Sequence, residues 1–214
     1  NWKFKGTEVR IDDSQDEVRL FGACVAIPNC DDEPFLLNVN FRVKIGVPGS
    51  AQTFVSNNDG GPSFGEGPAF NAVSEGTGGV ANFNGVQALD LLDLANTNNH
   101  LEIMGTYVWA TEEDTIGNGV AADSLADVLQ DALNDTIASS NLTSLDANFI
   151  LDLILGNIGN ALGIVVNNIP TFGLGDDVLG GGMYIGIGAT GTLGAALDAA
   201  IGTIEVLLRV GLSH

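Results

Sequence analysis

The stretch LNVNFRVKIGV, residues 37–47, alternates apolar and polar side chains over its whole length. Successive side chains of an extended strand point to opposite faces, so this period of two predicts a strand with one apolar and one polar face. Shorter alternations predict further strands at residues 2–11, 17–27, 101–110, 183–187 and 204–210. Strands are therefore expected on both sides of residues 37–47.

Helical spacing of apolar residues is concentrated between residues 86 and 165. A short helix is expected at residues 86–94, a second beginning at Asp123 or Ser124, and a third opening at Ser144 and broken by glycines at 156, 159 and 163. The whole pattern predicts a mainly β protein. We expect an antiparallel β-sandwich or jelly roll with a helical insertion at about residues 86–165, in a single domain spanning residues 1–214.

Charge is distributed unevenly along the chain, whose net charge is −20. Residues 1–44 hold six Lys or Arg and eight acids, a net of −2, whereas the rest holds only Arg209 against nineteen acids, a net of −18. Nucleic-acid backbones and anionic membranes bind through Lys and Arg, so neither is an expected partner. Cations, salt or a basic surface of another copy would compensate the negative charge.

Composition favours a secreted or cell-surface protein. The chain begins at Asn1 without a basic and apolar leader, as after leader removal, although a trimmed chain would look the same. No stretch of about 18 uninterrupted apolar residues predicts membrane insertion. A halophilic origin is the alternative explanation of the acidity, but only 16% of residues are charged, below the ~25% of ordinary domains.

The two cysteines, Cys24 and Cys30, lie six positions apart. This spacing does not match a redox pair. A zinc site needs four ligands, and the two cysteines and two histidines of the chain are scattered along the sequence. A disulfide that closes a small loop is expected, with two free thiols as the alternative.

Calcium is the cofactor that the sequence suggests, because oxygen ligands gather at several turns. The candidate metal ligands are Asp31, Asp32 and Glu33; Asn57 and Asp59; Glu112, Glu113 and Asp114; and Asp176 and Asp177. None of these groups has EF-hand spacing, so solvated turns remain the alternative.

Catalytic residue types are scarce. The only histidines are His100 and the terminal His214, and no GxSxG elbow accompanies them. The Gly-rich segment 173–182 lacks a lysine and carries two acids, which excludes nucleotide binding. Asn134-Asp135-Thr136 and Asn141-Leu142-Thr143 are glycosylation sequons, with meaning only in a host that glycosylates secreted proteins.

We therefore expect a secreted, non-enzymatic structural subunit that self-assembles as an extracellular fibre, a surface layer or a capsid-type shell. Its N-terminal strand, with Trp2, Lys3, Phe4 and Lys5, would pair with a sheet edge of a neighbouring copy, or alternatively close its own sheet. A calcium-assisted carbohydrate-binding module using the Gly- and Asn-rich loop at residues 56–85 is the second hypothesis. A glycosidase with a pair of carboxylates is the third.

Overall fold

The computed structural model describes residues 1–9, 19–20, 23–24, 34–57, 71–72, 79–112, 118–168 and 178–211. Its strands are β1 (Trp2–Lys5), β2 (Glu8–Val9), β3 (Arg19–Leu20), β4 (Ala23–Cys24), β5 (Pro34–Lys44), β6 (Gln52–Asn57), β7 (Asn71–Ala72), β8 (Val80–Phe83), β9 (Glu102–Glu112) and β10 (Val178–Ile187). Its helices are α2 (Asn118–Leu133), the π-helix η1 (Asn134–Ala138), α3 (Ala147–Asn168) and α4 (Gly191–Gly211).

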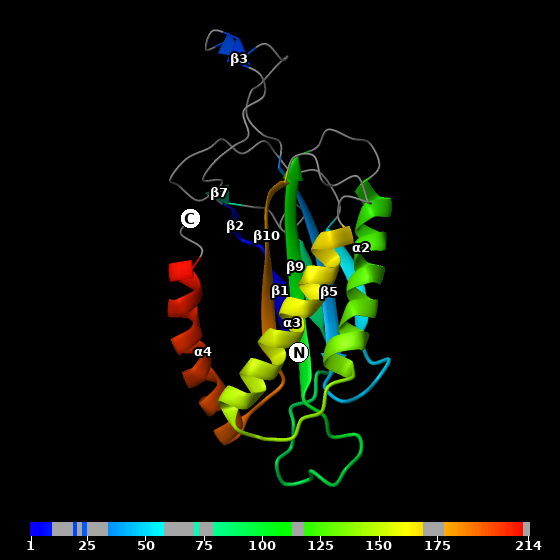
Figure 1. The fold of residues 1–214 in the computed structure, drawn as a ribbon, viewed down its shortest axis with the longest axis vertical. Coiled ribbons are helices and arrows are strands. Elements are labelled where there is room, and N and C mark those ends of the chain that lie inside the picture. The colour runs from blue at the N-terminus through cyan, green and yellow to red at the C-terminus, as the bar shows by residue number, and fades with distance from the viewer. Residues whose placement is uncertain are drawn as a thin grey trace.

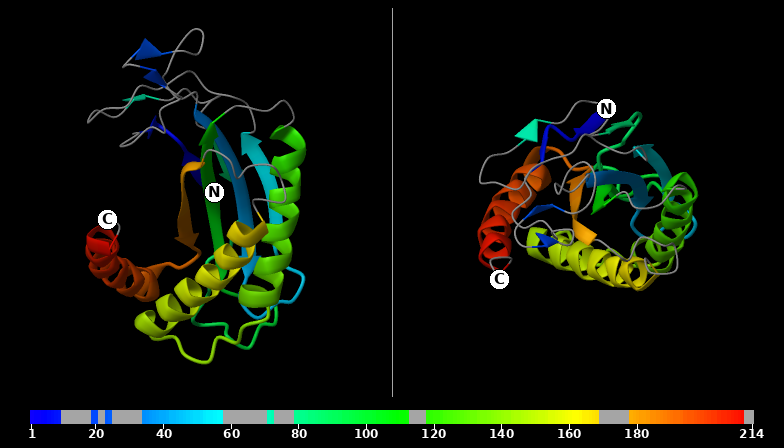
Figure 2. Two further views of the ribbon diagram at one scale, coloured as in Figure 1. Left: turned by 45° about the horizontal axis from the view of Figure 1, so that its top comes forward. Right: turned by 90° about the horizontal axis from the view of Figure 1, so that it is seen from above.

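The largest sheet has four antiparallel strands in the order β10-β9-β5-β6. Helices α2 and α3 cover one face of it, and α4 lies beyond β10 (Figure 1). The two-stranded antiparallel sheet β1-β8 lies on the opposite face (Figure 2). The fold thus combines antiparallel sheets with helices, and the expected β-sandwich or jelly roll is not confirmed.

The alternation at residues 37–47 predicted β5 correctly. Its apolar residues Leu37, Val39, Phe41 and Val43 are completely buried beneath the helices, where they meet side chains such as Leu125 and Ile150. The opposite face carries Asn38, Asn40 and Arg42, and part of this face is covered by the β1-β8 sheet rather than left to water. Burial of both faces explains why β5 and its neighbour β9 form the centre of the molecule.

Two glycines let aromatic rings lie directly on the strands. The ring of Phe41 crosses Gly105 on β9, where an added Cβ would come within 2.5 Å of Phe41 Cζ. On the opposite face Trp2 lies over Gly186 of β10, and an added Cβ there would be 3.2 Å from the ring. Glycine leaves one side of a strand without a side chain, which is why the aromatic rings can approach the backbone this closely.

Residues 86–94, expected as a helix, form a series of turns instead. Side chains form hydrogen bonds with backbone groups that would pair with one another in a helix. Asp90 Oδ1 accepts from the N–H of Leu92 at 2.9 Å, and Asn99 Nδ2 donates to the carbonyls of Asp90 and Asp93. Asp and Asn compete with helical hydrogen bonds in this way, and here they prevail.

Helices α3 and α4 correct two further expectations. The glycines at 156, 159 and 163 do not break α3, because all three are on its exposed side and buried Ile150, Ile154 and Val165 hold the other side against the core. Residues 204–210, expected as a strand, belong to α4. The preceding Leu193 and Leu197 are buried at helical spacing, and the helix they begin continues through the alternating segment.

Other boundaries differ by a few residues or more. Helix α2 begins at Asn118, ahead of the expected caps, and α3 begins at Ala147, where Asp146 Oδ1 accepts from the N–H groups of Asn148 and Phe149. The expected loop at residues 56–85 contains strand β8. The expected helical insertion at residues 86–165 contains β9, a central strand, so it is not purely helical.

Candidate functional site

Four aspartates form a ridge along α2 and η1: Asp123, Asp127, Asp131 and Asp135. All four are exposed, and each lies four residues from the next, which places them on one face of the helix. Like charges at this spacing repel, so the ridge depends on ions from solution for compensation.

A second surface has the opposite character. Within the described parts of residues 147–197, which include α3, β10 and the start of α4, the only charged side chain is Asp152. Leu155 on α3 is 36% exposed and Tyr184 on β10 is 62% exposed. We call the exposed side of α3, where Asp152 is the single charged residue described, the uncharged surface; α3 crosses the front of the molecule in Figure 1. Tyr184 lies on the other face of the main sheet, the face that carries Gly186.

The exposed side of α3 carries three glycines, so few side chains project from it. An added Cβ at Gly156, Gly159 or Gly163 would meet nothing within 4 Å. A helix face without side chains at these points allows another backbone to approach closely. Over Ala147–Val165, α3 is also long and apolar enough to cross a membrane by length and composition alone, but such composition is equally typical of a core helix.

The two edges of the main sheet differ. At β6 the outward N–H groups of Ala51 and Thr53 donate to Asn134 Oδ1 at 3.0 Å and Gln130 Oε1 at 3.2 Å, so α2 and η1 cap this edge. At β10 no such cap is found among the described side chains. Helix α4 lies beyond β10 but packs against α3 (Figure 2).

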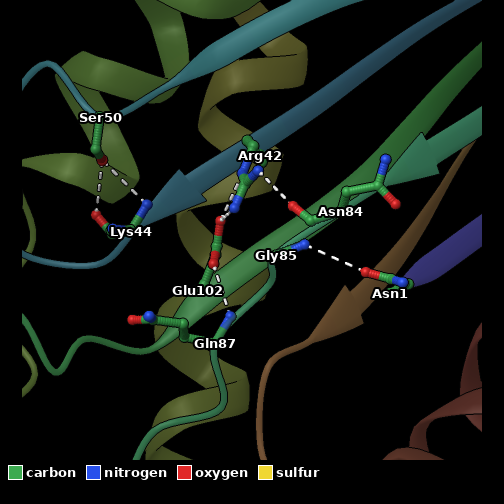
Figure 3. A network of polar contacts seen from close by, with 8 residues as sticks. All are labelled: Asn1, Arg42, Lys44, Ser50, Asn84, Gly85, Gln87 and Glu102. Atoms are coloured by element: carbon green, nitrogen blue, oxygen red, sulfur yellow. Dashed lines mark hydrogen bonds and ion pairs between the residues drawn. The ribbon is translucent and has the colours of Figure 1, made fainter.

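A network of polar contacts joins the sheet to the turns that follow β8 (Figure 3). Arg42 Nε donates to Glu102 Oε1 at 2.6 Å, and Arg42 Nη1 donates to the carbonyl of Asn84 at 3.2 Å. Glu102 Oε2 accepts from the N–H of Gln87 at 3.3 Å. The buried carboxylate thus fixes the point from which residues 87–100 extend.

These turns line an open, solvent-facing cavity of about 420 Å³. It is lined by Gln87, Ala88, Asp90, Asp93, Asn96, Asn98 and Asn99. One oxygen of each carboxylate is already used, since Asp90 Oδ1 accepts from Leu92 and Asp93 Oδ2 accepts from Asn96. The remaining oxygens and the amides could bind a hard cation or the hydroxyls of a polar ligand.

Most of the predicted metal ligands lie outside the described residues: Asp31, Asp32, Glu33, Asp59, Glu113, Asp114, Asp176 and Asp177. Of the others, Asn57 ends β6 and Glu112 ends β9. Glu112 pairs with Pro34, and its neighbour Thr111 pairs with Val178. Pro34, Glu112 and Val178 therefore lie close together at one end of the sheet. In the sequence, each of them belongs to or directly follows one of the predicted acidic groups, at residues 31–33, 112–114 and 176–177.

In the described part of the chain, no group of three or more His, Cys, Asp or Glu side chains is arranged to hold a metal ion. Sequence reasoning also missed the cavity at residues 87–99, because it predicted a helix for part of them. The density of Asn and Asp in DLLDLANTNN, residues 90–99, was the available signal for side chains that hold turns.

The N-terminal strand pairs within its own chain. Trp2, Lys3, Phe4 and Lys5 of β1 lie opposite Phe83, Asn82, Ala81 and Val80 of β8. The ring of Phe4 meets that of Phe83 edge to face, with centroids 5.7 Å apart. Cys24 lies in β4, whereas Cys30 is outside the described residues, so the disulfide stays a prediction.

Searches of protein-family models, curated proteins and solved structures found no match to this chain.

Proposed function

We propose that this chain is a secreted or cell-surface structural subunit, without enzymatic activity, that assembles with copies of itself into an extracellular fibre, a surface layer or a capsid-type shell. The separation of charge supports this proposal. On a chain of net charge −20, the aspartate ridge keeps copies apart, whereas the uncharged surface is where two copies can approach with the least repulsion.

The partner that best fits the uncharged surface is a second copy. A basic partner would gain little there, because Asp152 is its only carboxylate in the described residues. The three open glycines of α3 allow close packing of a second helix, and Leu155 supplies apolar area. We place the first contact on α3, since α4 lies beyond the β10 edge and would have to move aside for strand pairing there.

This route replaces addition of the N-terminal strand as the favoured mode of assembly, because β1 is already paired with β8. A complete β-sandwich also remains a proposal. Phe83 and Met104 already pack between the β1-β8 sheet and the main sheet, and a sandwich would require a wider second layer.

Light scattering coupled to size-exclusion chromatography tests the assembly. The mass of the particles should rise with protein concentration, and Leu155→Lys should weaken association at least tenfold by placing a charge in the contact. Leu92→Lys is the matched control, because Leu92 is 97% exposed on the turns after β8. A monomer at high concentration in both low and high salt would rule out the proposal, and electron microscopy would distinguish filaments, layers and shells.

A calcium-assisted carbohydrate-binding module is the second candidate. The neighbouring strand ends at Pro34, Glu112 and Val178 support it, since acidic groups adjoin them in the sequence, and so does the cavity at residues 87–99. Calcium should then raise the melting temperature and a chelator should lower it, with magnesium as the control. Glu112→Gln and Asp90→Asn would show which end of the molecule responds.

A further inference from the structure

Two sequons stand close together in the sequence, and the structure treats them differently. Each has the Asn-X-Thr pattern that oligosaccharyltransferases recognise, at Asn134 and at Asn141. The first lies within η1, and the second lies in the irregular connection between η1 and α3.

The side chain of Asn134 is committed to the fold. Its Oδ1 accepts from the N–H of Ala51 at 3.0 Å and thereby caps the edge at β6. Thr136, the third residue of this sequon, donates through Oγ1 to the carbonyl of Ala132 at 2.6 Å. Asn134 is half-buried, so a sugar on its Nδ2 would have to be accommodated beside the β6 edge that its Oδ1 contacts.

Asn141 has the opposite environment. Both Asn141 and Thr143 are exposed, in a segment without helix or strand that runs from residue 141 to residue 146. Neither side chain has a hydrogen bond among the contacts of the described residues. The connection passes across the lower end of the molecule in Figure 1, between α2 and the start of α3.

We propose that Asn141 is an N-glycosylation site and that Asn134 remains unmodified in the folded protein. The donor would be an oligosaccharide on a polyprenyl phosphate or pyrophosphate. Asn141 Nδ2 forms a bond to the anomeric carbon of the sugar, the bond from that carbon to the phosphate oxygen breaks, the lipid phosphate leaves, and the amide loses one proton to the transferase. The inference rests on the secreted location in the proposed function.

A glycan at Asn141 would also constrain the assembly. It would hydrate the lower end of the molecule next to Leu145, which is 38% exposed. Copies would then be kept from contact at this end, while the middle of α3 around Leu155 stays accessible. The glycan and the uncharged surface therefore have separate places on the molecule.

The test uses the full chain secreted from a yeast host that N-glycosylates its exported proteins. Intact mass, and release by peptide-N-glycosidase in heavy-oxygen water, should identify a glycan at Asn141 and none at Asn134 in the folded fraction. Asn141→Gln and Thr143→Ala should both lose the added mass, whereas Asn134→Gln should keep it. His100→Thr is the positive control, because it completes a sequon at exposed Asn98.

A bare Asn141 in the secreted chain would overturn the inference, and a modified Asn98 in the control would show that the transferase had reached the chain. Occupancy of Asn134 in folded protein would also overturn it. These outcomes are independent of the assembly measurement: an assembling chain without the glycan refutes only the site, whereas a glycosylated monomer refutes only the assembly.

Discussion

Arg42 on β5 reaches diagonally across the sheet to Glu102 on β9, although the register places Lys44 opposite Glu102 and Met104 opposite Arg42. Glu102 is only 2% exposed, so its carboxylate needs a charged partner or several hydrogen bonds. It obtains both, from Arg42 and from the N–H of Gln87. This pair connects the centre of the sheet to the turns that line the open cavity.

Removing Arg42 should therefore be costly. Arg42→Met leaves the buried Glu102 carboxylate without its cation, and we expect the free energy of unfolding to fall by about 3 kcal/mol. Replacing both residues, as Arg42→Met with Glu102→Leu, should restore part of the loss because no buried charge remains unpaired. Urea unfolding measures both variants, with Lys44→Met as the control; an equal cost for Arg42→Met and Lys44→Met would show that the loss does not come from the buried carboxylate.

The aspartate ridge should make stability depend on salt. Asp127 has like charges four residues away on both sides, at Asp123 and Asp131, so Asp127→Asn should stabilise the fold by about 0.5 kcal/mol in dilute buffer. At about 1 M salt, where the screening length is ~3 Å, the gain should vanish.

Thermal or urea unfolding in the two salts measures the effect on the ridge. Asp198→Asn on α4 is the matched control, since exposed Asp198 has glycines at the corresponding positions 194 and 202. A gain of equal size at Asp198, or one that persists in salt, would show that repulsion along the ridge is not its source.

Sequence predicted the strands of the main sheet best where apolar and polar residues alternate strictly, as around Val39 and Phe41 on β5. It failed at residues 86–94, where apolar spacing resembled a helix while Asp90 and Asn99 used their side chains to hold turns. It failed again at residues 204–210, because a window of seven residues fits both a strand and a buried helix. Predictions from local patterns were correct only where the spacing of apolar residues fitted either a strand or a helix and not both.

The candidate sites were harder to foresee than the fold. The net charge follows from composition, but the ridge at Asp123 and Asp127 depends on where α2 is exposed, and the uncharged surface depends on which side of α3 is buried. The hydrogen bond between Asn134 and Ala51 spans 83 positions in the sequence. No local pattern contains such a contact, so the difference between the two sequons becomes visible only in three dimensions.

Glycines at 105 and 156 should respond oppositely to alanine. An added Cβ at Gly105 would come within 2.5 Å of both Phe41 Cζ and the carbonyl oxygen of Tyr184, so Gly105→Ala should destabilise the fold by about 1–3 kcal/mol. At Gly156, on the open side of α3, nothing lies within 4 Å, and Gly156→Ala should stabilise the helix by about 1 kcal/mol.

Urea unfolding measures both glycine variants, and light scattering on Gly156→Ala adds a second readout. If the open side of α3 contacts another copy, the variant should be more stable as a monomer and yet associate more weakly. A Gly156→Ala chain that associates as strongly as the unmodified protein would move the contact away from this part of α3.

Tyr107 should make the protein less stable in alkali. Burial of this residue between the sheet and the helices raises the pKa of its hydroxyl from 10.0 to about 12, because the phenolate would lose its hydration. Between these two values the unfolded chain loses the proton while the folded chain keeps it, so stability present below pH 10 declines as the pH rises toward 12. Tyr107→Phe removes this contribution, and urea midpoints measured across that range should fall less steeply than in the unmodified chain. Tyr184→Phe, at an exposed position, should leave the decline unchanged; an equally steep fall in Tyr107→Phe would assign the alkaline instability to other groups.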